Sequence, residues 1–320
     1  MIHIKVLSIK KVDLVLLANE NLEDISSFKE MYMASAYRFR KLSGKYSDVK
    51  SFVGNYAAVK VENLWGFIDE NGTFVLDAVF EDADSMISQK AAVKKDGEYY
   101  FIDIDGDRVL ASLESFEKIY SFYGGLAVAK KNGKYGYIDQ KMVPGKMEWD
   151  FATNFDDGTA ALKQGDKWAI VDSAGKFLSG YVFDDIKINE QLVCCTNGVL
   201  FAKKEGKYMM SNSKGVAVTS QQYDAACLFE DSGPAAVKSG NQWGFVDNQG
   251  NVMIEPRYEE ARSFNIGLAP VKVDGLWGYI NSDGTVVIEP EYEDTRPFAG
   301  NRTAAVKKDG MWRFIQLEMD

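Results

Sequence analysis

Residues 274–298 read DGLWGYINSDGTVVIEPEYEDTRPF, and residues 241–264 carry the same pattern as NQWGFVDNQGNVMIEPRYEEARSF. The aromatic residue that opens this pattern recurs eight times, always as Trp or Tyr, at spacings of 33 to 40 residues. A constant spacing of this size indicates a tandem repeat whose units pack on their neighbours. The aromatic column consists of Trp65, Tyr99, Tyr135, Trp168, Tyr208, Trp243, Trp277 and Trp312.

Each repeat has the signals of a short β-meander. An Asp-Gly or Asn-Gly turn precedes many of the column aromatics, which predicts a tight hairpin because both central residues of such a turn need positive φ. The alternating segment after the turn, such as residues 277–281, predicts a strand, and a second turn leads to a third. A connector with two apolar plugs, such as Tyr292 and Phe298, ends the repeat. The glycine after the aromatic, such as Gly278, leaves room for a backbone or a ring to approach.

We therefore predict an all-β fold of about eight three-stranded antiparallel repeats over residues 37–320. Residues 1–36 lie outside the period and are expected to form an N-terminal cap, a strand plus a short helix. The expected arrangement is an open superhelical, solenoid-like stack. The alternative is a closed eight-bladed propeller-like ring, because residues 38–52 resemble the third strand and connector that the last repeat lacks.

Charge and composition exclude several classes of partner. The chain has 37 basic and 47 acidic side chains, hence a net charge of -10, which repels nucleic acid. No apolar run is long enough to span a membrane or form a signal peptide, so we expect a cytoplasmic protein, although a mis-assigned start site would allow export. Three cysteines, two of them adjacent, make a poor disulfide framework.

The sequence offers no specific catalytic or metal site. The sole histidine is His3. Asp103, Asp105 and Asp107 lack the spacing of a calcium loop, and Asp103 recurs as the turn residue of other repeats. We therefore expect no enzyme activity and no cofactor. The repeated aromatics are interpreted as core, so binding is sought where the repeats differ. The candidate residues are Cys194, Cys195 and Asn197 in the insertion 190–199, Arg296, which is expected on an exposed loop, and Arg313, where other repeats have glycine.

The repeat pattern resembles the WG (or KWG) β-repeat family, most closely over residues 241–298 and least over residues 183–215, where Tyr208-Met209 replaces Trp-Gly. This resemblance implies a bacterial tandem array that acts as a binding or scaffold module. We accordingly predict a non-enzymatic interaction module with a protein partner. The alternative is carbohydrate or cell-envelope binding by the Trp/Tyr column, because the hairpin around residues 130–137 is similar to choline-binding repeats. The oligomeric state stays open.

Overall fold

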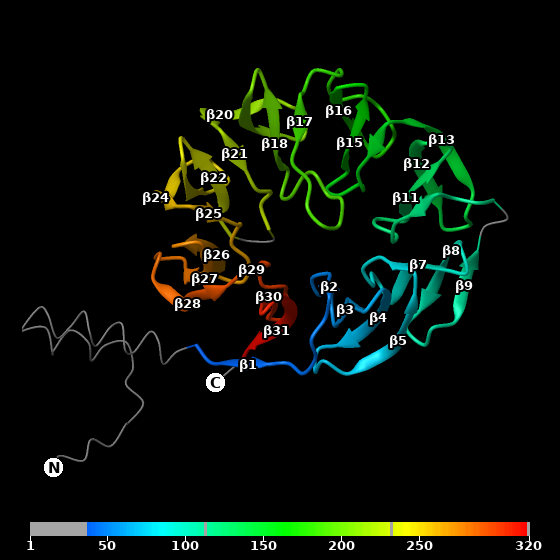
Figure 1. Cartoon of the computed structure of the whole chain (residues 1–320). Coiled ribbons are helices and arrows are strands. Elements are labelled where there is room, and N and C mark those ends of the chain that lie inside the picture. The colour runs from blue at the N-terminus through cyan, green and yellow to red at the C-terminus, as the bar shows by residue number, and fades with distance from the viewer. Residues whose placement is uncertain (1–36, 112–113, 231–232, 319–320) are drawn as a thin grey trace, which may run out of the picture.

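The computed structural model describes residues 37–111, 114–230 and 233–318. These residues form eight small antiparallel sheets that follow one another around a closed ring, as blades of a propeller (Figure 1). The expectation of an open stack is wrong, and the alternative of a closed ring is correct. No helix occurs within the described ranges, and the predicted cap over residues 1–36 lies outside them.

The strands are numbered in chain order, and each blade runs from the inside of the ring to the outside. Blade 1 consists of β2 (Asp48–Val49), β3 (Tyr56–Val61), β4 (Leu64–Asp69) and β5 (Phe74–Phe80), and blade 2 of β6 (Asp82–Ala83), β7 (Lys90–Lys95), β8 (Glu98–Asp103) and β9 (Arg108–Ala111). Blade 3 consists of β10 (Lys118–Ile119), β11 (Leu126–Lys131), β12 (Lys134–Asp139) and β13 (Pro144–Trp149). Blade 4 consists of β14 (Phe151–Ala152), β15 (Thr159–Gln164) and β16 (Lys167–Asp172). Blade 5 consists of β17 (Asp185–Ile186), β18 (Val199–Lys204), β19 (Lys207–Asn212) and β20 (Ala217–Tyr223), and blade 6 of β21 (Ala225–Ala226), β22 (Ala235–Ser239), β23 (Gln242–Val246) and β24 (Val252–Tyr258). Blade 7 consists of β25 (Glu260–Ala261), β26 (Leu268–Val273), β27 (Leu276–Asn281) and β28 (Val286–Tyr292). Blade 8 consists of β29 (Asp294–Thr295), β30 (Thr303–Lys308), β31 (Met311–Leu317) and β1 (Phe39–Lys41).

The predicted connector contributes a strand of its own, so most blades have four strands rather than three. In blade 8, Asp294 pairs with Lys307 and Thr295 with Val306, which makes this part of the connector the innermost strand of the next blade. The chain therefore changes blade between the two plugs. Two faces result. The hairpin face carries the turns between the second and third strands, and the loop face carries the turns between the first and second strands.

Strand β1 closes the ring, because it comes from the start of the described chain and completes the last blade. Phe39, Arg40 and Lys41 pair antiparallel with Leu317, Gln316 and Ile315 of β31. Two further main-chain hydrogen bonds join Tyr46 and Trp312 at 2.9 and 3.0 Å. Closure removes the free edges that an open stack would expose at both ends.

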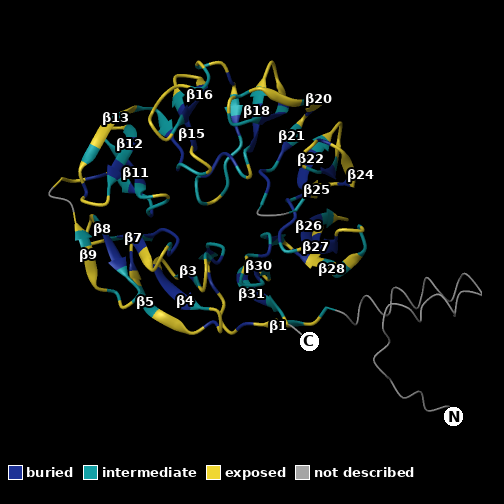
Figure 2. Ribbon diagram, turned by 180° about the vertical axis from the view of Figure 1, so that it is seen from behind, coloured by how far each residue is buried: buried dark blue, intermediate teal, exposed yellow. Residues whose placement is uncertain are grey.

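The core consists of clusters that lie between neighbouring blades rather than within one blade. One cluster joins Trp277 and Tyr279 of blade 7 to Ala304, Val306 and Ile315 of blade 8. The burial colours show buried residues on the middle strands and exposed residues on the outer strands and turns (Figure 2). Each blade is therefore stabilised by apolar contacts with the next one, as expected for a repeat architecture.

The glycine after the column aromatic allows the outer strand to cross closely. A Cβ atom at Gly278 would lie 2.4 Å from the carbonyl oxygen of Ile288 in β28, and one at Gly66 would lie 2.7 Å from that of Leu76 in β5. These distances are shorter than any normal contact of a Cβ atom. The close approach expected from the sequence is thus made by the backbone of the outer strand.

Gly278→Ala is expected to destabilise the protein by about 1–3 kcal/mol, because the added methyl group forces β27 and β28 apart. Urea unfolding followed by fluorescence measures the change. The matched control is Gly300→Ala, since a Cβ atom there would have no heavy atom within 4 Å. Equal stabilities for the two variants would contradict the close crossing.

An acidic residue at the start of most connectors caps a turn on the hairpin face. The main-chain N–H of the turn glycine donates to this carboxylate in six blades, at 2.7 to 3.1 Å. Asp150 and Asp224 also accept a hydrogen bond from a lysine of the preceding blade, Lys134 and Lys207, respectively. Asp184, which starts the connector into blade 5, accepts one from Lys167 in the same way. Part of the acidic excess in the sequence therefore has a structural role. The six capping residues are Glu81, Glu117, Asp150, Asp224, Glu259 and Glu293.

Acid is expected to destabilise the ring through these carboxylates. The hydrogen bonds from Lys134, Lys167 and Lys207 lower the pKa values of Asp150, Asp184 and Asp224, respectively. A carboxylate whose pKa is lower in the folded state stabilises the fold above its unfolded pKa, near 4, and loses that contribution as the pH falls.

The midpoint of thermal unfolding should therefore be level between about pH 7 and pH 5 and fall below about pH 4. The triple variant Asp150→Asn, Asp184→Asn, Asp224→Asn should show a shallower fall. A midpoint that rises between pH 5 and pH 3 would contradict this role of the carboxylates.

Candidate functional site

The aromatic column lies between the blades. Five of its eight rings are buried, and Tyr99, Tyr135 and Trp243 are partly buried. In seven blades a lysine directly across the hairpin faces the ring, with its Nζ 5.5 to 6.0 Å from the ring centroid. The rings therefore contact the core on one side and a lysine chain on the other, an arrangement typical of cation-π pairs at a partly exposed site.

The insertion 190–199 buries both of its cysteines. Cys194 and Cys195 are fully buried in the cluster between blades 4 and 5, together with Trp168 and Phe183. Burial raises the pKa of each thiol to about 12, so neither is a thiolate at neutral pH. Asn197 occupies the turn before β18 with positive φ and is exposed. The two cysteines contribute to packing, and the turn residue is the exposed part of this candidate set.

Arg296 does not lie on an exposed loop, as the sequence suggested, but beneath the insertion. Its guanidinium packs over the Trp312 ring, with Cζ 5.1 Å from the centroid, and donates to the Glu190 carboxylate and to the Val49 carbonyl oxygen. The main-chain N–H of Ser51 also donates to Glu190, at 3.2 Å. Burial lowers the pKa of Arg296. Glu190 of blade 5 therefore contacts blades 8 and 1 on the opposite side of the ring.

The loop that carries Glu190 extends into the middle of the ring (Figure 1). Asn154 of blade 4 holds it through two hydrogen bonds, to the carbonyl oxygens of Gln191 at 2.6 Å and Leu192 at 2.8 Å. The repeat pattern pointed to the insertion and to Arg296 separately, and Glu190, which joins them, was not among the candidate residues. The extra length of the connector that contains residues 190–199 was the one signal in the sequence for a contact across the ring.

Arg313 has a local role in its own hairpin. Its guanidinium donates to the carbonyl oxygen of Lys308 at 2.5 Å and to the carboxylate of Asp309 at 3.1 Å. Four other blades have glycine at this position. Arginine fits in blade 8 because the outer chain of this blade leaves the ladder after Leu42 and rejoins it at Tyr46. The structure therefore does not bring Arg313 together with Arg296 or the insertion.

No group of three or more His, Cys, Asp or Glu side chains is placed to hold a metal ion within the described ranges. Asp103 instead accepts hydrogen bonds from the main-chain N–H groups of Asp105 and Asp107 in its own turn. No helix in the described part of the chain is long and apolar enough for a membrane crossing. His3 lies outside the described residues.

Two blades expose apolar side chains at the ends of their hairpins. Val61 and Leu64 flank the turn of blade 1, and Val273 and Leu276 flank that of blade 7, each between 37% and 40% exposed. These four residues, here called the apolar tips, lie on the hairpin face on either side of blade 8. In blades 2 to 6 the corresponding pairs are polar or charged throughout. The apolar tips are thus a departure from the repeat that is confined to one sector of the ring.

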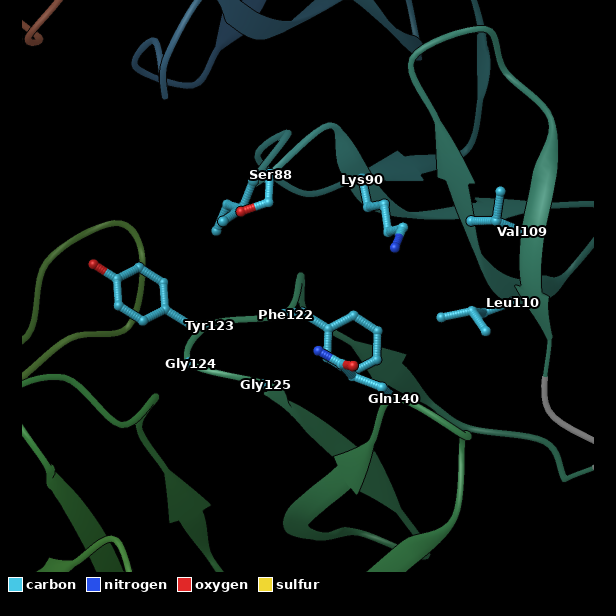
Figure 3. A pocket seen from close by; sticks show the side chains of 10 residues that line it. Ser88, Lys90, Val109, Leu110, Phe122, Tyr123, Gly124, Gly125 and Gln140 are labelled. Carbon is cyan, nitrogen blue, oxygen red and sulfur yellow. The ribbon is translucent and has the colours of Figure 1, made fainter.

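A pocket of about 340 Å³ lies on the loop face between blades 2 and 3 (Figure 3). Val109 and Leu110 of β9 and the ring of Phe122 form its apolar wall, and Lys90 and Gln140 contribute polar groups. The Phe122 ring stacks on Phe101, with centroids 4.3 Å apart, so one ring face is supported by the core. The pocket is therefore a concave site with a rigid apolar wall and a few polar groups, typical of small ligand sites.

Two departures from the repeat coincide at this pocket. Lys90 begins β7, a position where the other seven blades carry an uncharged residue. The turn before β11 is Gly124-Gly125, the one inner turn of the eight that consists of two glycines. The facing turn, Ser88-Gln89, has positive φ at both residues without a glycine. The pocket was not predictable from the sequence, because its two sides come from different blades.

The comparisons with known proteins agree with the observed repeats. The model of the family described as WG containing repeat matches more than half of the chain, at residues 42–65, 65–99, 115–135, 146–168, 243–277 and 277–312. The unmatched stretch between residues 168 and 243 contains the insertion and the divergent blade 5. No curated protein matches the sequence.

Two solved structures are similar to this chain at low sequence identity. A structure described as a eukaryotic initiation factor is 12% identical, with a TM-score of 0.52 over 85% of this chain and 83% of that chain. The AfRom2 CNH domain is 8% identical, with a TM-score of 0.49 over 88% of this chain and 100% of that chain. The likeness to the initiation factor structure, at such low identity, shows the fold alone. The repeat columns and the family match together show that this chain belongs to the WG containing repeat family.

Proposed function

We propose that the protein is a non-enzymatic interaction module whose rigid ring binds a protein partner on the hairpin face. The observation that supports this proposal is the pair of apolar tips. The hairpin ends occupy equivalent exposed positions in every blade. Five blades have polar residues there, so packing of the repeat does not require the apolar side chains of the other two. Exposed apolar groups with a polar surround are typical of protein interaction sites.

The apolar tips also fit a protein better than a small ligand. They lie at the ends of hairpins, on convex turns that flank blade 8, whereas small ligands prefer concave sites. Lys308 and Met311 flank the turn of blade 8 itself, and Lys308 forms an ion pair with Glu291 of blade 7 at 2.6 Å. A partner with an apolar surface would complement this sector.

The aromatic column favours this proposal over carbohydrate binding. A sugar-binding ring needs an open face, whereas the column rings are held between blades and face lysines. A glycan array checks the alternative directly: retention of a glycan that depends on column residues, in a variant that stays folded, would favour the carbohydrate module.

The proposed function is tested by comparing two double variants in a quantitative pull-down from a bacterial lysate. Val61→Glu with Val273→Glu places two charges on the apolar tips. The control, Gln164→Glu with Ser239→Glu, adds the same charge at the equivalent positions of blades 4 and 6, directly before the hairpin turn. A partner enriched by the wild type should be retained by the control and lost about tenfold or more by the tip variant. Equal recovery with both variants would overturn the proposal.

A further inference from the structure

We propose that the pocket between blades 2 and 3 binds the end of a peptide chain, with Lys90 pairing with the terminal carboxylate and the wall of Val109, Leu110 and Phe122 holding an apolar last side chain. This site lies on the loop face and does not involve the apolar tips, so it goes beyond the proposed function. Peptide binding in the pocket and partner binding on the hairpin face can therefore be tested independently.

The charge of the ligand is inferred from Lys90. Among the ten residues that line the pocket it is the one charged side chain, and it forms no ion pair or hydrogen bond with a described residue. Its partner in the ladder, Asp103, accepts hydrogen bonds from its own turn instead. A single ammonium group complements a carboxylate, whereas phosphate sites usually add arginine or several N–H donors.

The shape of the ligand is inferred from the apolar wall. Val109 is 38% exposed, and Phe122 is partly buried and fixed by its stacking on Phe101. In Figure 3 the ammonium group of Lys90 points toward the space above Phe122 and Leu110. A ligand with its charge at Lys90 would therefore place the adjacent apolar group on this wall, where burial stabilises the complex.

The remaining polar groups suit a peptide group beside the carboxylate. Ser88 and Gln140 line the pocket from opposite blades, and neither side chain forms a hydrogen bond with a described residue. A hydroxyl and an amide can each donate and accept, as the C=O and N–H of a peptide group require. The bare Gly124-Gly125 turn leaves space for the preceding residues of the peptide.

The experiment measures binding of the tripeptide acetyl-Gly-Gly-Leu to the full chain by calorimetry. The wild type should bind the free acid with a Kd of about 0.1–1 mM. The same tripeptide with a C-terminal amide, and acetyl-Gly-Gly-Gly as the free acid, should each bind at least about tenfold more weakly, because one lacks the charge and the other the apolar side chain.

Two lysine variants locate the site. Lys90→Gln should weaken binding of the free acid by about tenfold or more. Lys95→Gln changes the exposed lysine at the other end of the same strand, on the opposite face, and should leave binding unchanged. Equal binding of acid and amide, an equal effect of the two variants, or no binding of the free acid at 10-fold above the expected Kd would each overturn the proposal.

Discussion

A chain shortened to begin at Ser47 is expected to unfold at a midpoint about 5–10 °C lower than the full chain and to associate at high concentration. This chain lacks β1, Leu42 and Tyr46. Leu42 and Tyr46 are buried against blade 1, and the loss of their burial lowers the free energy of unfolding by about 3–6 kcal/mol. The edge of β31 then becomes free to pair with another chain. Thermal unfolding and size-exclusion chromatography measure the two effects.

The control for this truncation is a chain that begins at Tyr37 and keeps β1. It should unfold at a midpoint about 5–10 °C above that of the chain that begins at Ser47 and should not associate at the same concentration. If the two truncated chains have the same stability, β1 does not close the ring, and blade 8 is stable with three strands.

Trp277→Ala should cost about 3–5 kcal/mol in free energy of unfolding, the usual cost of a large-to-small change in a packed core. Trp277 is 3% exposed and belongs to the cluster between blades 7 and 8, with Tyr292 and Phe298. The guanidinium of Arg262 lies 4.4 Å from its ring centroid and would lose that partner as well. Urea unfolding measures the loss, because the free energy is obtained from the midpoint and the slope.

Trp243→Ala is the matched control, because this ring occupies the same column but is partly exposed. Its cost should be clearly smaller than that of Trp277→Ala. A Trp277→Ala protein of unchanged stability that has lost retention on a glycan column would mean that the ring binds ligand, and the interpretation of the column as core would be wrong.

Local features of the repeat were predictable because they depend on residues close in sequence. The Asp-Gly turn before Trp277 and the glycine at position 278 each predict a backbone geometry that the structure shows. Alternation within residues 277–281 likewise predicts a strand, which the structure has as β27.

Features that join distant parts of the chain were not predictable from the repeat alone. The pairing of Arg40 with Gln316 decides between ring and stack, yet the local sequence of either strand is compatible with both. The contact of Glu190 with Arg296 depends on the diameter of the closed ring, which no single repeat determines. The pocket beside Lys90 forms only where blade 2 meets blade 3.

The central claim, that the chain is a closed ring, is tested most directly by a cross-link between Arg40→Cys and Gln316→Cys. These residues are directly paired across β1 and β31, and paired residues of this kind have Cα atoms about 5.5 Å apart, within the range that a disulfide spans. Cys227, the one native cysteine in the described chain that is not fully buried, is replaced by serine.

Mild oxidation of this variant should form an intramolecular disulfide in nearly all molecules at any protein concentration, seen by mass spectrometry and by faster migration on a non-reducing gel. An Arg40→Cys, Lys134→Cys variant, which pairs β1 with a distant blade, should remain reduced. Free thiols at positions 40 and 316 in a folded protein, or disulfides that form only between molecules, would contradict the closed ring.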